Sequence, residues 1–306
     1  MSLARLDVEL VRRHLARSRD QARELIAAGV VSVDGLVATK PARQVTAAAA
    51  VTVAAPAADE EYVSRGGHKL AAALDAFAGD GLTIAGLRCL DAGASTGGFT
   101  DVLLRHGAHA VLAVDVGYGQ LAWSLRSDPR VTVLDRTNVR YLTAQTVAPF
   151  GGPVDVTVAD LSFIRLGLVL PALRAVTRPG GHLALLVKPQ FEVGRERLGS
   201  GGVVRDLAAH VDVLRRVRGE AAAEGLVARG LVASPLPGPA GNVEYVLHLL
   251  HHDGELAAGV DDDLVEAVVA AGPGRLAPVA PRRDAEGDPT HPDGPPDGSP
   301  RADGAG

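Results

Sequence analysis

The sequence predicts an α/β protein built around a doubly wound parallel sheet, preceded by a small α+β unit. Two observations support this prediction. From about residue 64, short apolar runs typical of buried strands alternate with segments of helical periodicity, the pattern of a parallel sheet covered by helices. The first 55 residues instead contain two amphipathic segments followed by alternating valines around an Asp-Gly pair, which predicts helices and then a hairpin.

The N-terminal unit is predicted to hold two helices and a small sheet. Apolar residues recur at helical spacing over 6–15 and again from Ser18 to a stop near Gly29. The valines that flank Ser32, with the Asp-Gly turn after them, predict the hairpin. Val45 and the Val-Thr-Val run at 51–53 would complete the sheet.

The second unit is predicted to alternate strands and helices. Its first helix follows Ser64 and carries Leu70, Leu74 and Phe77 on one face. The expected strands cover 87–90, 110–114, 131–134, 154–158, 182–187 and 246–250, and the later helices cover about 97–107, 166–176 and 261–270. Ligands of such sheets bind at the carboxyl ends of the strands, so polar residues that follow strands are candidates for a site.

Composition sets the domain boundaries. A first domain is expected over 1–55, a linker rich in Ala, Pro and acids over 56–63, and the second domain over 64–270. The segment 271–306 is rich in Pro, Gly and Asp and is predicted to be disordered. The formal net charge of −5 is concentrated in this part of the chain, because residues 253–306 alone contribute −8. The remaining body is +3, which is compatible with a polyanionic partner.

Several classes of protein are excluded by the residues present. The single cysteine, Cys89, excludes a disulfide framework or a Cys-cluster zinc site and favours a reducing compartment, the cytoplasm. No apolar run of 18 residues predicts a membrane span, and the charged N-terminus lacks the apolar core of a signal peptide. No His, Asp and Glu cluster indicates a metal, so no metal site is predicted.

A glycine-rich loop is the strongest local motif. Residues 91–100, DAGASTGGFT, lie between a predicted strand and a predicted helix and match neither the G-x-G-x-x-G pattern nor a P-loop. Asp91 beside the loop suits a cationic amino-acid ligand, and Asp115 after the next strand is placed where ribose hydroxyls are held. Asp135 and Asn138 follow a third strand, so the pattern favours a small-molecule site over a structural turn.

Four charged residues form a second candidate site at the same edge. Asp160 and Lys188 follow predicted strands, Glu244 precedes one, and Lys69 starts a helix. A single lysine at a strand end is more often a solvated charge. This chain, however, uses Arg for nearly all of its positive charge and has only three lysines, two of them in this set. Since Lys can release its proton and Arg does not, the choice favours a titratable amine.

The first unit resembles the S4 RNA-binding domain. The resemblance is carried by RLDVELV at 5–11 and LARSRDQARELIAAGVVSVDG at 15–35. Charge alone fits a solvated helical face equally well. The resemblance implies an arginine-rich face that meets folded RNA through phosphates and shape. The implied RNA-binding residues are Arg5, Arg17, Arg19, Arg23 and Lys40.

The second unit resembles the Rossmann-like methyltransferases that use S-adenosyl-L-methionine. The resemblance implies this cofactor, with the loop around its methionine end, Asp115 on its ribose, and Asp135 with Asn138 near its adenine. The implied loop residues are Asp91, Gly93, Ser95, Thr96, Gly97, Gly98 and Phe99.

The two units in this order are similar to the TlyA family, the hemolysin-like ribosomal RNA 2′-O-methyltransferases. The signatures are SRGGHKL at 64–70, DAGASTGGFTD at 91–101, DLSFI at 160–164, LVKPQFE at 186–192 and GNVEY at 241–245. The resemblance implies a catalytic tetrad of Lys69, Asp160, Lys188 and Glu244. It also implies methylation of cytidine 2′-hydroxyls in 16S or 23S rRNA. Arg65 and Phe163 are further expected contacts with RNA.

The residues themselves suit this chemistry. A ribose hydroxyl is a poor nucleophile until its proton has an acceptor. Lys188 is the candidate base, with Lys69 nearby and exclusion of water favouring its neutral form. Two alternatives stay open. One is a membrane-active hemolysin, for which the sequence offers no convincing amphipathic or spanning segment, and the other is a non-catalytic RNA-binding assembly factor that uses the S4 unit alone.

Overall fold

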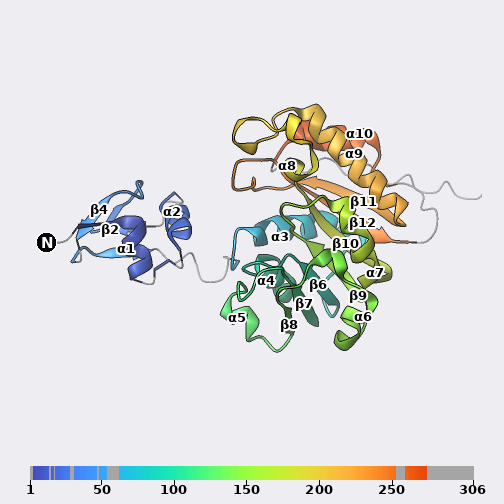
Figure 1. The fold of residues 1–306 in the computed structure, drawn as a ribbon, viewed down its shortest axis with the longest axis horizontal. Helices are drawn as coiled ribbons and strands as arrows, with labels where there is room; N and C mark the ends of the chain where they lie inside the picture. Colours follow the sequence, from blue (N-terminus) through green and yellow to red (C-terminus); the bar gives the residue numbers. More distant parts are fainter. Residues whose placement is uncertain are drawn as a thin grey trace, which may run out of the picture.

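A computed structural model describes residues 3–13, 15–16, 18–27, 31–46, 48–53, 62–252 and 259–273. Within these residues the strands form one seven-stranded sheet and two small sheets (Figure 1). The predicted α/β class is confirmed. The disordered tail predicted over 271–306 lies outside the described residues from position 274 onward.

The N-terminal unit contains two helices and two small antiparallel sheets. Its elements are β1 (Leu3–Arg5), α1 (Leu6–Arg12), α2 (Arg19–Ala27), β2 (Val31–Val33), β3 (Leu36–Val37), β4 (Gln44–Thr46) and β5 (Val51–Val53). The predicted hairpin joins β2 to β3, with Asp34 and Gly35 at φ of 55° and 80° in its turn. β5 pairs with β2 as expected, whereas Val45 belongs to β4, which pairs with a strand β1 that the sequence did not predict.

The large sheet has the strand order β11-β12-β10-β9-β6-β7-β8. Five strands are parallel: β6 (Arg88–Ala92), β7 (Ala110–Val114), β8 (Val131–Leu134), β9 (Val154–Ala159) and β10 (Thr177–Val187). β11 (Leu226–Ala233) and β12 (Tyr245–His251) form an antiparallel pair, and β12 is also antiparallel to β10. The sheet is therefore mostly parallel, as predicted, with an antiparallel edge that the sequence did not predict, and β11 was not predicted.

Helices cover both faces of the sheet, as the doubly wound prediction requires (Figure 1). They are α3 (Gly66–Phe77), α4 (Gly98–Arg105), α5 (Trp123–Arg126), α6 (Ala144–Val147), α7 (Leu170–Val176), α8 (Pro189–Glu192), α9 (Leu207–Ala223) and α10 (Asp262–Ala271). Short 3-10 turns are η1 (Ala78–Asp80), η2 (Val139–Tyr141), η3 (Ala148–Phe150), η4 (Leu166–Leu168), η5 (Arg195–Arg197) and η6 (Ser200–Gly202). Leu183 and Leu185 of β10 pack in one apolar cluster with α7, α9 and α10, and Ala184 and Leu186 pack in the other with α3 and α4.

Three predicted elements differ in detail from the structure. The helix expected over 166–176 is split into η4 and α7, since Pro171 at the start of α7 lacks the N–H of a continuous helix. Asp91 lies inside β6 rather than after it. α9 was not predicted, although Asp206 caps its first turn by accepting the N–H of Ala208. No helix of the described residues is long and apolar enough to cross a membrane.

Candidate active site

The four predicted tetrad residues form two ion pairs. Nζ of Lys69 lies 2.5 Å from Oε2 of Glu244, and Nζ of Lys188 lies 2.5 Å from Oδ1 of Asp160. Lys69 and Glu244 are buried, whereas 24% of the Asp160 side chain is exposed. The Lys188–Asp160 contact is an ion pair without an aligned hydrogen bond, because Oδ1 of Asp160 finds no donor in line with it among the described residues. The Lys69–Glu244 pair is thus closed to water, whereas the Lys188–Asp160 pair, the open pair, is reached by water mainly from the side of Asp160.

The strand topology explains why these side chains meet. Asp160 follows β9 and Lys188 follows β10, and the two strands are parallel neighbours, so both residues leave the sheet at the same edge. Because β12 is antiparallel to β10, Glu244 enters the sheet at the edge where Lys188 leaves it. The unpredicted antiparallel edge therefore completes the site that the sequence predicted.

Two further contacts tie the pairs to each other. Gln190, two residues after Lys188, donates from Nε2 to Oε1 of Glu244 at 3.1 Å. Gly66, at the start of the helix that carries Lys69, lies so close to Asp160 that a Cβ there would be 3.7 Å from its Oδ2. The tetrad is therefore one connected group at the carboxyl edge.

An exposed aromatic ring borders the open pair. Nζ of Lys188 donates to Oγ of Ser162 at 3.0 Å, and the next residue, Phe163, is 89% exposed. The Phe163 ring lies 4.9 Å from the ring of Phe191, which is itself 5.8 Å from Nζ of Lys188. An exposed ring beside an ammonium group is a surface on which a nucleobase can stack.

The glycine-rich loop joins β6 to α4 and touches the tetrad. Gly93 and Gly97 have φ of 86° and 102°, and Ser95 has φ of 48°, so the loop turns through left-handed conformations. A Cβ on Gly93 would lie 2.7 Å from the carbonyl oxygen of Asp160. Only glycine allows the loop to approach the residue after β9 this closely.

Asp115 holds the loop from the neighbouring strand β7. Its half-buried carboxylate accepts the N–H of Ser95 at 2.8 Å and the N–H of Gly117 at 2.7 Å. Beside the loop, Gln120 contacts Oγ of Ser95 and lines an open pocket of about 500 Å³. The pocket is lined by Tyr118, Gly119, Gln120, Leu121, Ala122, Trp123 and Arg126.

Three of the predicted cofactor residues lie beneath the loop. Asp91 is fully buried, and its Oδ2 accepts a hydrogen bond from Oγ1 of Thr100 at 2.6 Å. Its Oδ1 has no hydrogen-bond partner among the described residues. Burial raises the pKa of Asp91 to about 7, against the effect of the Thr100 hydrogen bond. Phe99 packs in the apolar cluster with α3, and Gly98 is buried against Ser64. These positions support the loop from below, and their contact with a cofactor stays a prediction.

Two of the remaining predicted cofactor residues, Asp135 and Thr96, contact residues that line the pocket. Asp135 forms an ion pair at 3.0 Å with Nη1 of Arg126, which lines the pocket. The carbonyl oxygen of Thr96 accepts the N–H of Ala122, another lining residue, at 3.2 Å. Asn138 is exposed and its side chain caps η2, so the structure does not bring it into the pocket lining.

A buried aspartate organises the arginines of the N-terminal unit. Asp7 of α1 accepts from Nε of Arg5 at 3.0 Å and from Nη2 of Arg19 at 2.9 Å, and Nε of Arg23 lies 3.7 Å away. The hydrogen bond from Arg5 lowers the pKa of Asp7 well below its usual range, although burial opposes the shift. The side chains of Arg5 and Arg19 are each about half exposed, so an anion can reach them from solvent.

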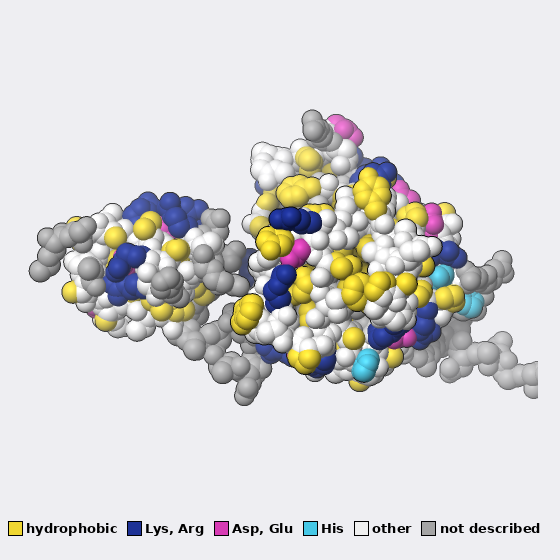
Figure 2. Space-filling model, turned by 60° about the horizontal axis from the view of Figure 1, so that its bottom comes forward, with side chains coloured by type: hydrophobic (Ala, Val, Ile, Leu, Met, Phe, Trp, Pro, Cys, Tyr) yellow, Lys and Arg dark blue, Asp and Glu magenta, His cyan; other side chains and the backbone are white. Residues whose placement is uncertain are grey.

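The structure describes two of the three other residues that were predicted to contact RNA, Lys40 and Arg65. Lys40 and Arg65 are exposed, and Arg65 directly precedes α3. Arg17 lies outside the described residues. Figure 2 shows Lys and Arg side chains gathered in patches on the N-terminal unit, the body on the left of that view.

Sequence reasoning did not single out three residues that take part in the site. Ser162, Gln190 and Glu192 all contact the loops that carry the tetrad. Ser162 lies in the DLSFI motif, and Gln190 and Glu192 lie in the LVKPQFE motif. Their closeness in sequence to Asp160 and Lys188 is the signal that could have identified them. Over the described parts of the chain, no group of His, Cys, Asp and Glu could hold a metal ion.

Comparison with protein families agrees with this architecture. The FtsJ-like methyltransferase family matches residues 62–250, and the S4 domain family matches residues 4–51. The fold and the site therefore define a class: a Rossmann-like methyltransferase joined to an S4 domain.

Individual relatives show to which family of these methyltransferases the chain belongs. The chain is 54% identical to the 16S/23S rRNA (cytidine-2′-O)-methyltransferase TlyA of Mycobacterium tuberculosis, over 88% of this chain and 98% of that protein. It is 34% identical to Hemolysin A of Brachyspira hyodysenteriae, over 80% and 99% of the two chains. A solved structure of a protein from Streptococcus thermophilus, described as a hemolysin, is 38% identical with a TM-score of 0.69 and covers 89% of this chain and 96% of its own. The chain belongs to the TlyA family of FtsJ-like methyltransferases.

Proposed function

We propose that this protein transfers a methyl group from S-adenosyl-L-methionine to the 2′-hydroxyl of a cytidine ribose in 16S or 23S rRNA. The observation that carries the proposal is the pair of Lys–carboxylate contacts beside a glycine-rich loop, at one edge of a doubly wound sheet. The relative that shares 54% identity is named for this reaction, and the proposed substrate puts the reaction in the cytoplasm.

The residues beside the pocket fit the cofactor. Oδ1 of Asp91 is buried without a partner among the described residues, which is unusual for a carboxylate and suits a cationic amino group nearby. Asp115 uses one lone pair of each oxygen on the loop backbone, which leaves capacity to accept from ribose hydroxyls. Tyr118 and Trp123 offer exposed rings for an adenine. When bound, the cofactor supplies an electrophilic methyl group on a sulfonium.

The open ion pair is suited to activate the hydroxyl. Lys188, whose Nζ has Asp160 and Ser162 as partners, is the proposed base, and it accepts the hydroxyl proton as the neutral amine after its ammonium proton has been released to solvent. Asp160 fixes the amine in place, so that a hydroxyl that reaches Nζ of Lys188 beside Asp160 is held in line with the methyl donor. Proton acceptance by a positioned side chain contributes typically about 10²–10⁴-fold to such a reaction. Lys69 and Glu244, which are buried and paired, complete the proposed catalytic tetrad and join α3 to the residue before β12.

The arginines of the N-terminal unit are the proposed RNA anchor. Because Asp7 holds Arg5 and Arg19 in fixed positions, less side-chain entropy is lost when a phosphate binds. Phe163 is the proposed stacking surface for the target base, and exposed Lys40 and Arg65 extend the cationic surface.

The proposal is tested by replacing the proposed base. Lys188→Ala should lower methyl transfer to rRNA by at least about 10²-fold, while cofactor affinity measured by calorimetry changes little. Arg178→Ala removes a cation at the opposite edge of the sheet and serves as the matched control, with transfer unchanged. Full transfer by Lys188→Ala would show that Lys188 is not the base. A wild-type protein that binds no cofactor would instead favour the non-catalytic RNA-binding alternative.

A further inference from the structure

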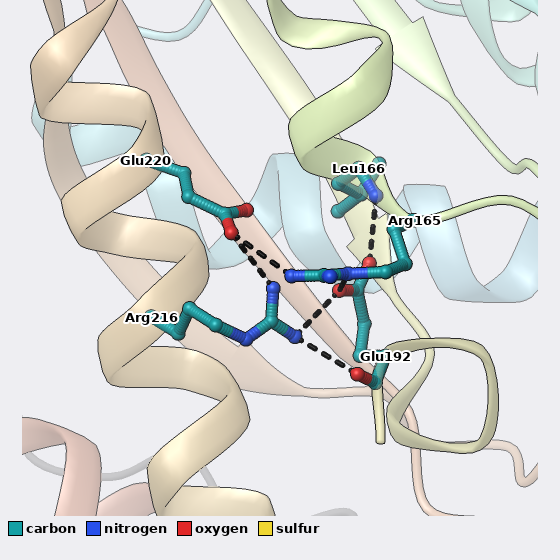
Figure 3. A network of polar contacts seen from close by, with 5 residues as sticks. All are labelled: Arg165, Leu166, Glu192, Arg216 and Glu220. Atoms are coloured by element: carbon teal, nitrogen blue, oxygen red, sulfur yellow. Dashed lines mark hydrogen bonds and ion pairs between the residues drawn. The ribbon is translucent and has the colours of Figure 1, made fainter. Parts of the chain in front are cut away.

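Glu192 lies where two loops of the candidate site meet (Figure 3). It ends α8, the turn that follows Lys188, and its side chain is only 1% exposed. Its Oε1 accepts the backbone N–H of Leu166 at 2.7 Å, and Leu166 begins η4 directly after the segment 160–165. A carboxylate from the Lys188 loop therefore fixes the end of the Asp160 loop.

Arginines from both sides anchor this carboxylate. Nη2 of Arg216 in α9 donates to Oε2 of Glu192 at 2.8 Å and to its carbonyl oxygen at 3.0 Å. Arg216 and Arg165 both donate to Oε1 of Glu220, at 2.9 and 3.1 Å, and the four side chains form one network (Figure 3). A buried carboxylate is retained at low cost only with such partners.

The segment between the two fixed ends is strained. At its start, the N–H of Asp160 donates to the carbonyl oxygen of Ala92 at 3.1 Å, and at its end Leu166 is held by Glu192. Between them Phe163 has φ of 63° with its ring exposed. A bulky residue at positive φ costs about 1–3 kcal/mol and persists only where the surrounding structure holds it.

We propose that Glu192 is a positioning residue for methyl transfer. By holding Leu166, it keeps the 160–165 segment in the strained conformation that sets Asp160 and Ser162 against Lys188 and presents Phe163 to the RNA. Glu192 does not touch the substrate. The inference rests on the proposed function, and it assigns the effect to the length and acceptor oxygen of the side chain rather than to its charge.

Two substitutions separate length from charge. Glu192→Gln keeps an oxygen at the same reach for Leu166 and removes the charge. Its NH2 replaces the oxygen that accepts from Arg216, so this variant should have a lower melting temperature while the Leu166 contact is kept. Glu192→Asp keeps the charge that pairs with Arg216 but is one methylene too short to keep Leu166 as well. Asp155→Ala is the matched control, since Asp155 also accepts one backbone N–H, from Arg88 at 2.9 Å, and one arginine, Arg178 at 2.6 Å, at the opposite edge of the sheet.

The experiment measures amide hydrogen exchange of residues 160–168 together with kcat, KM for rRNA, and cofactor affinity. Glu192→Asp should exchange about 10–100-fold faster at Leu166 and lose a similar factor in kcat, with cofactor affinity within about threefold, because the buried N–H of Leu166 has lost its acceptor. Glu192→Gln should stay within about threefold of the wild type in both readouts. Asp155→Ala should lower the melting temperature and leave exchange and kcat unchanged.

Three results would overturn the inference. Wild-type exchange and kcat in Glu192→Asp would show that the Leu166 contact does not hold the loop. Equal losses in Glu192→Gln and Glu192→Asp would make charge the controlling property. If Asp155→Ala lost kcat in proportion to its fall in melting temperature, the loss of kcat in Glu192→Asp would be explained by lower overall stability. A wild-type protein without transfer activity would contradict the proposed function, while the exchange data would still test the contact.

Discussion

The buried Lys69–Glu244 pair should behave differently in stability and in catalysis. Lys69→Met leaves the carboxylate of Glu244 buried, with Gln190 as its remaining partner. Removing one charge of a buried pair lowers the free energy of unfolding by about 3–5 kcal/mol, since the remaining charge has neither water nor a counter-ion beside it. The pair's side chains are 9% and 1% exposed, so solvent offers little compensation.

The double substitution Lys69→Met with Glu244→Leu should recover most of this loss. Replacing both charges with apolar groups of similar size is often neutral, because no uncompensated charge is left. In a domain of this size, about 3–5 kcal/mol corresponds to a drop in melting temperature of about 6–20 °C for the single variant. All of these variants should lose methyl transfer, so stability and activity separate.

Thermal unfolding followed by circular dichroism measures the effect. Arg197→Met is the control, because its pair with Asp212 is 40% and 58% exposed and should contribute less than about 1 kcal/mol. A Lys69→Met variant within about 1 kcal/mol of the wild type would refute the reasoning. A double variant that is no more stable than the single one would refute it as well.

Two further predictions concern the glycine-rich loop. Burial raises the pKa of Asp91 to about 7, so the folded protein holds a proton that the unfolded chain releases near pH 4, and stability falls as pH rises toward 7. Relative to Asp91→Asn, the wild type should lose up to about 3 kcal/mol between about pH 5 and pH 7.5 in urea unfolding, and parallel pH curves would contradict this. Gly93→Ala should weaken cofactor binding by about tenfold or more, since its Cβ would meet the carbonyl oxygen of Asp160, whereas Gly86→Ala, with φ of 76° and open space around it, carries similar backbone strain without the clash. Cofactor affinity is measured by calorimetry. Equal affinities of the two glycine variants would show that the close approach of Gly93 to Asp160 is not needed for cofactor binding.

The sequence predicted the parts of the fold that depend on local patterns. The strands 110–114 and 131–134 and the hairpin around Asp34 lie where the alternation and the turn residues place them. β1 was missed because Leu3–Arg5 has neither the alternating valines nor the turn residues that predicted the equally short β2 and β5. α9 and β11 were missed although Asp206 and the apolar spacing that follows it are ordinary helix signals.

The candidate site was predicted as a set of residues but not as pairs. Strand ends place Asp160 and Lys188 at one edge, and this follows from the alternation of strands and helices. Which carboxylate meets which amine depends on the antiparallel β12, because Lys69 and Glu244 are 175 residues apart in the chain. Glu192 could not be found from the sequence for the same reason, since its partners Leu166 and Arg216 come from two separate segments.

The location of the methyl group on the RNA tests the central claim most directly. Purified 16S and 23S rRNA, or the ribosomal subunits, are incubated with the protein and labelled S-adenosyl-L-methionine, and the modified nucleoside is identified by mass spectrometry. A cytidine that carries the label on its 2′-oxygen, at a position that resists alkaline cleavage, is the expected product. A label on a base, or no label on rRNA despite cofactor binding, would contradict the central claim.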